Sequence, residues 1–177
     1  MSWQYRGINE ITPKDANWNY CGMKIFDLSV EGTHQIIFDN FEGILLSLSA
    51  ENVAVTVDHV EFKLQGRTGV FSGISDWIYI PVGSSLKILG NNGLVALCTA
   101  QATKVFPACY VGKEKVSVEI RGSSFATRQV NNIATPESFG GAEKILVCEV
   151  LTPGGNWSSW PPHRHDGIAD CEFNNEE

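Results

Sequence analysis

Short apolar runs, separated by glycine, asparagine and aspartate, recur along most of the chain. Few windows show the 3.6-residue period of an amphipathic helix, and the runs are rich in Val, Ile, Leu and Phe, as β-strands are. Residues 58–59 and 90–93 predict turns, because Asn, Asp and Gly tolerate positive φ. A strand about every ten residues is typical of a small barrel or sandwich. The pattern therefore predicts an all-β fold with strands at residues 25–30, 43–48, 53–57, 60–64, 77–81, 85–89 and 94–100.

A polar break at residues 113–115 divides the chain, and one β-barrel domain is predicted for residues 1–115. After the break, residues 116–120 and 145–150 predict new strands, with a polar loop over residues 131–141 between them and a turn at residues 152–155. About sixty residues with three or four strands would leave an open apolar face and an exposed edge. We therefore expect residues 116–177 to begin a second barrel that continues in a longer protein.

The densest candidate chemistry lies in the string GNWSSWPPHRHD at residues 155–166. Side chains two positions apart on a strand point to the same side, so His163 and His165 could bind one metal ion. Two histidines after a double proline could equally be exposed residues that bind nothing. A hard divalent site normally adds a carboxylate, and spacing does not choose among the downstream candidates. These are Asp166, Asp170, Glu172, Glu176 and Glu177.

Composition narrows the function classes. Thirteen Lys and Arg against twenty Asp and Glu give a net charge of -7, which argues against binding to a nucleic-acid backbone. No stretch approaches the ~20 apolar residues of a membrane span, and the first residues lack a signal-peptide core. The five cysteines form no C-x-x-C pair, so we expect buried, reduced thiols. These features indicate a soluble, cytoplasmic protein with neither nucleic acid nor membrane as a partner.

Other polar candidates carry weaker signals. Arg121 and Arg128 are predicted to lie in a loop of small residues, where a guanidinium could bind a carboxylate, although most arginines are simply exposed. His34 and His59 stand beside turn-like residues and are expected to be solvated or to cap turns. The tryptophans are expected in the core.

The strings TRQVNNI at residues 127–133 and EVLTPGGNWSSWPPHRHD at residues 149–166 resemble the 5-deoxy-glucuronate isomerase family of myo-inositol catabolism. Weaker similarity at residues 66–71 and 78–81 extends the resemblance over most of the chain. It implies a bicupin, with two cupin β-barrels in one chain, related in fold and reaction type to 4-deoxy-5-threo-hexosulose-uronate ketol-isomerase. The implied reaction is the aldose–ketose isomerisation of 5-deoxy-glucuronate to 5-dehydro-2-deoxy-gluconate, with a divalent metal in the second barrel.

The resemblance also implies site residues. His163 and His165 match two metal ligands of the family, and Glu177 best matches a third, while the family's further histidine has no counterpart after residue 165. Zinc, manganese and iron suit such ligands alike. Arg128, and then Arg121, are expected to bind the carboxylate of a small sugar acid. The sequence does not identify the general base and is compatible with a homo-oligomer.

Two other functions stay open at this stage. One is a cupin that binds a sugar acid or acts as a scaffold without catalysis. The other is a different metal-cupin reaction, such as dioxygenation, with iron held by the same histidines. The string at residues 152–166 favours the isomerase. We expect the 177 residues alone to bind metal weakly and to lack activity, because one ligand and most of the second barrel are missing.

Overall fold

The computed structural model describes residues 9–161, which form thirteen strands, one short α-helix and two 3₁₀ helices. The helices are α1 (Pro13–Ala16), η1 (Lys113–Lys115) and η2 (Ser124–Ala126). The strands are β1 (Glu10–Ile11), β2 (Cys21–Asp27), β3 (Thr33–Ile37), β4 (Phe41–Ser47), β5 (Glu51–Val57), β6 (Val60–Gly66), β7 (Trp77–Ile80), β8 (Ser85–Leu89), β9 (Leu94–Gln101), β10 (Cys109–Val111), β11 (Ser117–Arg121), β12 (Arg128–Ala134) and β13 (Val147–Leu151). No helix among these residues is long and apolar enough to cross a membrane.

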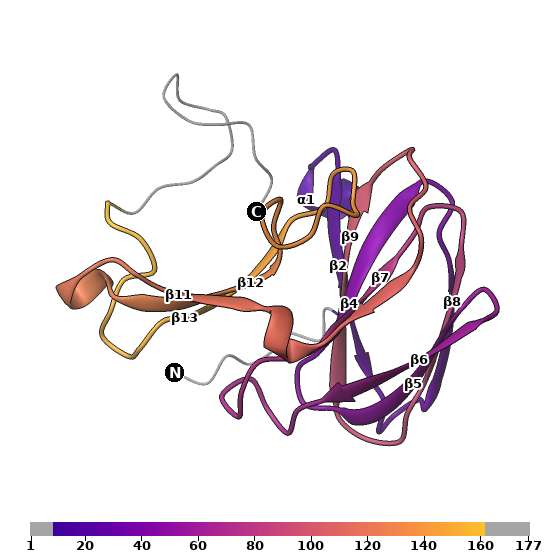
Figure 1. Cartoon of the computed structure of the whole chain (residues 1–177), viewed down its shortest axis with the longest axis horizontal. Helices are drawn as coiled ribbons and strands as arrows, with labels where there is room; N and C mark the ends of the chain where they lie inside the picture. Colours follow the sequence, from indigo (N-terminus) through magenta and orange to yellow (C-terminus); the bar gives the residue numbers. More distant parts are fainter. Residues whose placement is uncertain (1–8, 162–177) are drawn as a thin grey trace.

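Two antiparallel sheets form a barrel around the main core (Figure 1). One sheet has the order β1-β2-β9-β4-β7-β10 and the other β3-β8-β5-β6. On β5, Val53, Val55 and Val57 point into this core, whereas Asn52 and Ala54 are exposed. This alternation arises because one face of the four-stranded sheet meets solvent.

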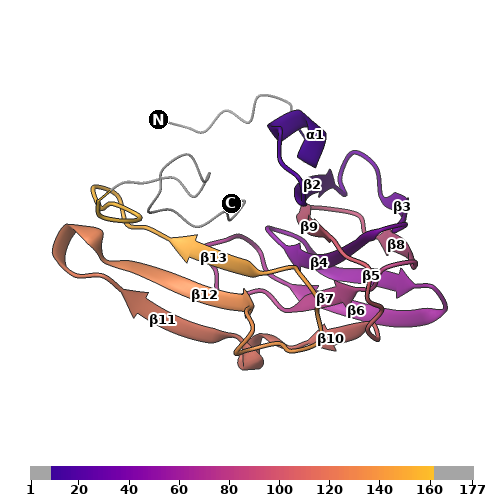
Figure 2. The same cartoon turned by 90° about the horizontal axis from the view of Figure 1, so that it is seen from above.

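The outer face of the six-stranded sheet is covered as well. A second core joins Ile44, Trp77 and Tyr79 of that sheet to Ile133 and Val147 of the sheet β11-β12-β13. Strands β4 and β7 are therefore buried on both faces, which explains their continuous apolar sequence. The three-stranded sheet projects from this side of the barrel (Figures 1 and 2).

The structure confirms the all-β prediction, and each predicted strand between residues 25 and 100 overlaps an observed one. The loop predicted over residues 131–141 is wrong at its start, because residues 131–134 belong to β12. Asn131 and Asn132 suggested a loop, but both are buried and their amides donate hydrogen bonds to Glu149 and Glu119. The division at residue 115 stays a prediction, since residues from both sides share the second core.

A buried carboxylate fixes the loop that precedes β13. Glu42, on the outer face of β4, is fully buried and accepts backbone hydrogen bonds from Glu143, Lys144 and Ile145 at 3.0, 2.6 and 2.7 Å. The hydroxyl of Tyr79 donates to the same carboxylate at 2.7 Å. In return, the Glu143 carboxylate accepts the N–H groups of residues 103 and 104, each at 2.7 Å. These bonds to Lys104 and Thr103 hold the pKa of Glu143 below its usual value.

A glycine makes the corner after β6. Gly66 has φ +73°, and a Cβ there would lie 1.9 Å from the carbonyl oxygen of Ala50. The next residue, Arg67, donates its N–H to that oxygen at 3.1 Å. The Asp76 carboxylate accepts the N–H groups of Gln65 and Gly66. This corner directs the Arg67 side chain into the interior, where it is 4% exposed.

We expect Gly66→Ala to lower the free energy of unfolding by about 2 kcal/mol or more, because it adds a left-handed strain and a clash with backbone. Gly69→Ala is the matched control, since a Cβ there meets nothing within 4 Å. It should change stability by less than about 1 kcal/mol. Urea unfolding measures both, and equal losses would contradict this role of Gly66.

The Glu42–Tyr79 bond predicts a pH dependence. Burial, and then the hydrogen bond to Glu42, raise the pKa of Tyr79 far above its ordinary value of about 10. A raised pKa in the folded state means that the contribution to stability is complete below about pH 10 and is lost as pH rises further. Tyr79→Phe should therefore cost about 1–2 kcal/mol at pH 7 and weaken the fall in stability above pH 10. An unchanged alkaline slope in urea unfolding would count against this reading.

Candidate functional site

One face of the three-stranded sheet gathers charged and polar side chains. Strand register places Arg121 opposite Arg128, and Asn132 between Ser117 and Cys148. Residues opposite one another on neighbouring strands share a face. We call this surface the polar face. Its charged and polar residues are Ser117, Glu119, Arg121, Arg128, Asn132 and Cys148, and Val130 and Val150 lie among them.

Glu119 organises the polar face. It accepts hydrogen bonds from the Arg121 guanidinium at 2.8 Å and from the Asn132 amide at 2.7 Å. These bonds, that of Arg121 first, hold the pKa of Glu119 below its usual value. The Cys148 thiol donates to the Asn132 side-chain oxygen at 3.6 Å. Because Arg121 and Glu119 are about half exposed, their ion pair contributes little to stability. The pair does, however, partly neutralise the positive charge of Arg121.

The two arginines predicted to bind a carboxylate thus lie side by side at the end of one sheet. They are at strand ends rather than in a loop: Arg121 ends β11 and Arg128 begins β12. Arg128 donates to the Ala126 carbonyl at 3.2 Å, and within residues 9–161 it has no carboxylate partner. The Arg128 guanidinium therefore keeps N–H donors for a ligand carboxylate, whereas Arg121 already donates to Glu119.

The opposite face of the sheet is joined to the barrel by an ion pair between the buried Arg67 and Glu149, whose side chain is 15% exposed. Both carboxylate oxygens of Glu149 accept from the Arg67 guanidinium, one of them at 3.0 Å. Arg67 also donates to the carbonyls of Ser47 and Gly73, at 2.9 and 2.8 Å. The Asn131 amide completes the site with a 2.9 Å bond to Glu149. Every polar atom of the pair therefore has a fixed partner, which such burial requires.

This pair was not predicted from the sequence. Arg67 and Glu149 are 82 positions apart, and no periodicity relates them. The one signal was that both fall in strings that carried the family resemblance. The pair sets the direction of β13, and β13 leads into the segment before the predicted histidine ligands.

An exposed aromatic cluster follows β13. Trp157 donates its backbone N–H to the carbonyl of Phe125 at 2.7 Å, and the Asn156 side-chain amide donates to the carbonyl of Thr127 at 2.8 Å. The Trp160 ring meets Phe125 and Trp157 edge-on, at centroid distances of 5.3 and 5.4 Å. Trp157 and Trp160 are 48% and 58% exposed, so the prediction that they lie in the core is wrong.

The predicted metal ligands His163, His165 and Glu177 lie outside the residues that the structure describes, as do the other downstream carboxylates. Between residues 9 and 161, no group of three or more His, Cys, Asp or Glu side chains could hold a metal ion. The metal site therefore stays a prediction.

The remaining predictions have mixed outcomes. His59 is exposed in the β5–β6 turn, as expected, but His34 is half-buried on β3, with its ring 4.6 Å from that of Phe26. No disulfide joins the four cysteines among residues 9–161. Burial raises the pKa of Cys98 to about 11, whereas Cys148 is exposed rather than buried.

Comparison with known proteins shows the family of this chain. The sequence model of the KduI/IolB family matches residues 2–177 of this chain. The chain belongs to the KduI/IolB family. The resemblance noted in its sequence is therefore confirmed.

Members of the KduI/IolB family that are similar to this chain are named 5-deoxy-glucuronate isomerase. Those of Geobacillus kaustophilus and Halalkalibacterium halodurans are 33% and 35% identical to it over 162 residues. The alignments cover 90% of this chain but 58% and 59% of the two relatives, so the chain spans less than two thirds of their length.

A solved structure in the same group supports the fold. The crystal structure of an IolB-like protein from Salmonella typhimurium LT2 superposes with a TM-score of 0.83 at 27% identity. The superposition covers 94% of this chain and 64% of the other. The fold is thus the cupin-like, all-β fold of this family.

We expect Arg67→Lys to lower the free energy of unfolding by about 3 kcal/mol, because an ammonium cannot replace a two-pronged guanidinium bond in a buried site. Arg121→Lys makes the same change in an exposed pair joined by a single hydrogen bond and should cost less than about 1 kcal/mol. Urea unfolding of both variants measures the difference. Equal losses would show that burial of the Arg67 pair has no special effect.

Proposed function

We propose that the complete protein is a 5-deoxy-glucuronate isomerase that converts 5-deoxy-glucuronate to 5-dehydro-2-deoxy-gluconate in the cytoplasm. The observation that carries this proposal is membership of the KduI/IolB family, in which relatives at 33% and 35% identity have that name. The reaction moves a carbonyl along the sugar chain. A base must take a proton from the carbon beside the aldehyde, and negative charge then develops on oxygen.

The polar face offers a binding site for the substrate carboxylate. Arg128 and Arg121 are opposite one another on the same face, and Arg128 has no carboxylate partner among residues 9–161. A net charge of -7 repels an acidic substrate at long range, so a local pair of guanidiniums is needed. Arg128 is the first candidate, and Arg121, which shares its charge with Glu119, is the second.

His163, His165 and Glu177 are the residues that would hold a divalent metal. Two imidazoles and a carboxylate are a donor set that zinc, manganese and iron accept. When bound, such an ion supplies positive charge that stabilises the developing negative charge on the sugar oxygens. Because Glu177 is assigned to the metal, Asp166 and Glu176 remain as candidates for the base.

Arginine variants test the carboxylate site. In the complete protein, Arg128→Gln should raise KM for the sugar acid by about 10-fold or more, since a charge-assisted bond contributes about 1.5–3 kcal/mol. Arg121→Gln should have a smaller effect. The control Lys63→Gln removes an exposed cation on β6 and should leave KM unchanged. An unaltered KM in both arginine variants would remove them from the substrate site.

Histidine variants test the metal. His163→Ala and His165→Ala in the complete protein should each abolish turnover and reduce the bound metal found by elemental analysis, because each loses a ligand. His59→Ala, at an exposed histidine of the β5–β6 turn, is the matched control. Full metal content and activity in the first two variants would overturn the ligand assignment. A complete protein that binds the sugar acid without turnover would instead be a binding module.

A further inference from the structure

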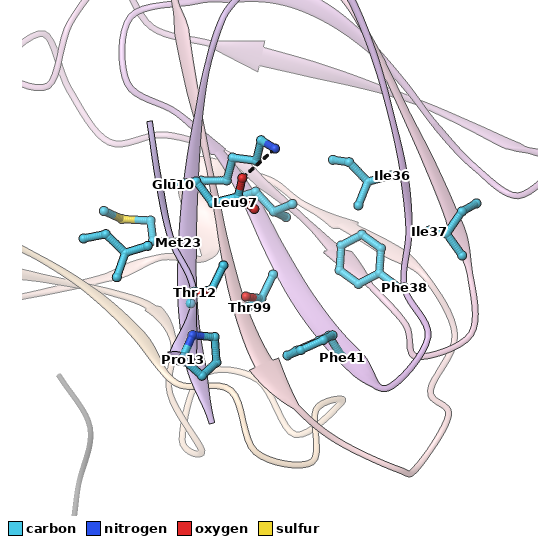
Figure 3. A pocket seen from close by; sticks show the side chains of 13 residues that line it. Glu10, Thr12, Pro13, Met23, Ile36, Ile37, Phe38, Phe41, Leu97 and Thr99 are labelled. Atoms are coloured by element: carbon cyan, nitrogen blue, oxygen red, sulfur yellow. Dashed lines mark hydrogen bonds and ion pairs between the residues drawn. The ribbon is translucent and has the colours of Figure 1, made fainter. Parts of the chain in front are cut away.

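The barrel contains a cavity that is separate from the polar face. It has a volume of about 220 Å³ and lies at the end of the barrel beside β1, β2 and β3 (Figure 3). Its apolar wall comes from both sheets and includes Ile36, Phe38, Phe41 and Leu97. None of these residues belongs to the polar face of the three-stranded sheet.

Strand register explains why the cavity is open. Gly22 pairs with Thr99, and Lys24 with Leu97, so these four residues share the inner face of the sheet. Gly22 has no side chain to fill the space, and a Cβ there would come within 2.9 Å of the Thr99 hydroxyl. The glycine therefore leaves this hydroxyl uncovered at the cavity wall.

The polar groups of the cavity are few. The Thr12 hydroxyl is engaged by Asp15, at 2.6 Å. The Lys24 ammonium is paired with Glu10 at 2.9 Å, as the dashed line in Figure 3 shows. The Thr99 hydroxyl has no hydrogen-bond partner within residues 9–161. The cavity thus offers apolar walls, a neutralised ion pair and one available hydroxyl.

We propose that this cavity binds a neutral, ring-sized apolar molecule that carries one hydroxyl group, of the cyclic alcohol or phenol class. An apolar cavity of about 150 Å³ accommodates benzene, so about 220 Å³ accommodates a six-membered ring with one substituent. The ligand hydroxyl bonds that of Thr99. A sugar acid fits this pocket poorly, because hydroxyls placed against its apolar walls would lose hydrogen bonds to water and the carboxylate would compete with Glu10 for Lys24.

Cyclohexanol tests the proposal by amide NMR titration of the full 177-residue chain. We expect saturable shifts at residues that line the cavity, and no shifts there with glucuronate. Thr99→Val keeps the side-chain shape and should weaken cyclohexanol binding about 5-fold, as expected for one neutral hydrogen bond, without weakening benzene binding. Thr56→Val, a half-buried threonine on β5 away from the cavity, should bind cyclohexanol as the parent does.

Ile36→Phe tests the same cavity by filling it, and should abolish binding of both probes while the protein stays folded. Absence of saturable shifts with cyclohexanol would overturn the proposal. So would equal binding of glucuronate, or unchanged cyclohexanol affinity in Thr99→Val. Loss of isomerase activity is not a readout here, so this result is separate from the test of the proposed function.

Discussion

The buried pair of Arg67 and Glu149 is the interaction on which the relation between barrel and three-stranded sheet depends. Its guanidinium comes from the corner that Gly66 makes at the end of β6, and its carboxylate lies in the middle of β13. Asn131 of β12 binds the same carboxylate, so one side chain of the barrel orients two strands of the sheet. The polar face, on the reverse side of those strands, takes its direction from this contact.

Carboxylates on both sides of the contact between the barrel and the segment before β13 accept hydrogen bonds from the opposite side. Glu42 projects from the barrel and binds the backbone of residues 143–145, while Glu143 reaches back to residues 103 and 104. The second apolar core supplies a non-directional attraction between the same surfaces. Hydrogen-bonded charges add direction, because each carboxylate is satisfied only in one arrangement of its donors.

The strands of the barrel could be predicted because their burial produces a local pattern of apolar residues in the sequence. On β5, buried apolar residues alternate with exposed ones, and on β4 the apolar residues are continuous. Strand β12 was missed, in part because the buried amides of Asn131 and Asn132 look like loop residues until their partners are known. No local sequence pattern indicates the Arg67–Glu149 pair, since the two residues are 82 positions apart and come together only in the folded chain. Arg121 and Arg128 were both candidates from the sequence, but only strand register shows that they lie opposite one another.

The measurement that tests the central role of this pair most directly is a double-mutant cycle on Arg67→Met and Glu149→Gln, read by urea unfolding. Each single change leaves a buried charge without its partner and should cost about 3–5 kcal/mol. The double variant should cost at least about 2 kcal/mol less than the sum, because neither charge then remains unpaired. Costs that add to within about 0.5 kcal/mol would show that the two residues stabilise the fold independently, and would contradict the account.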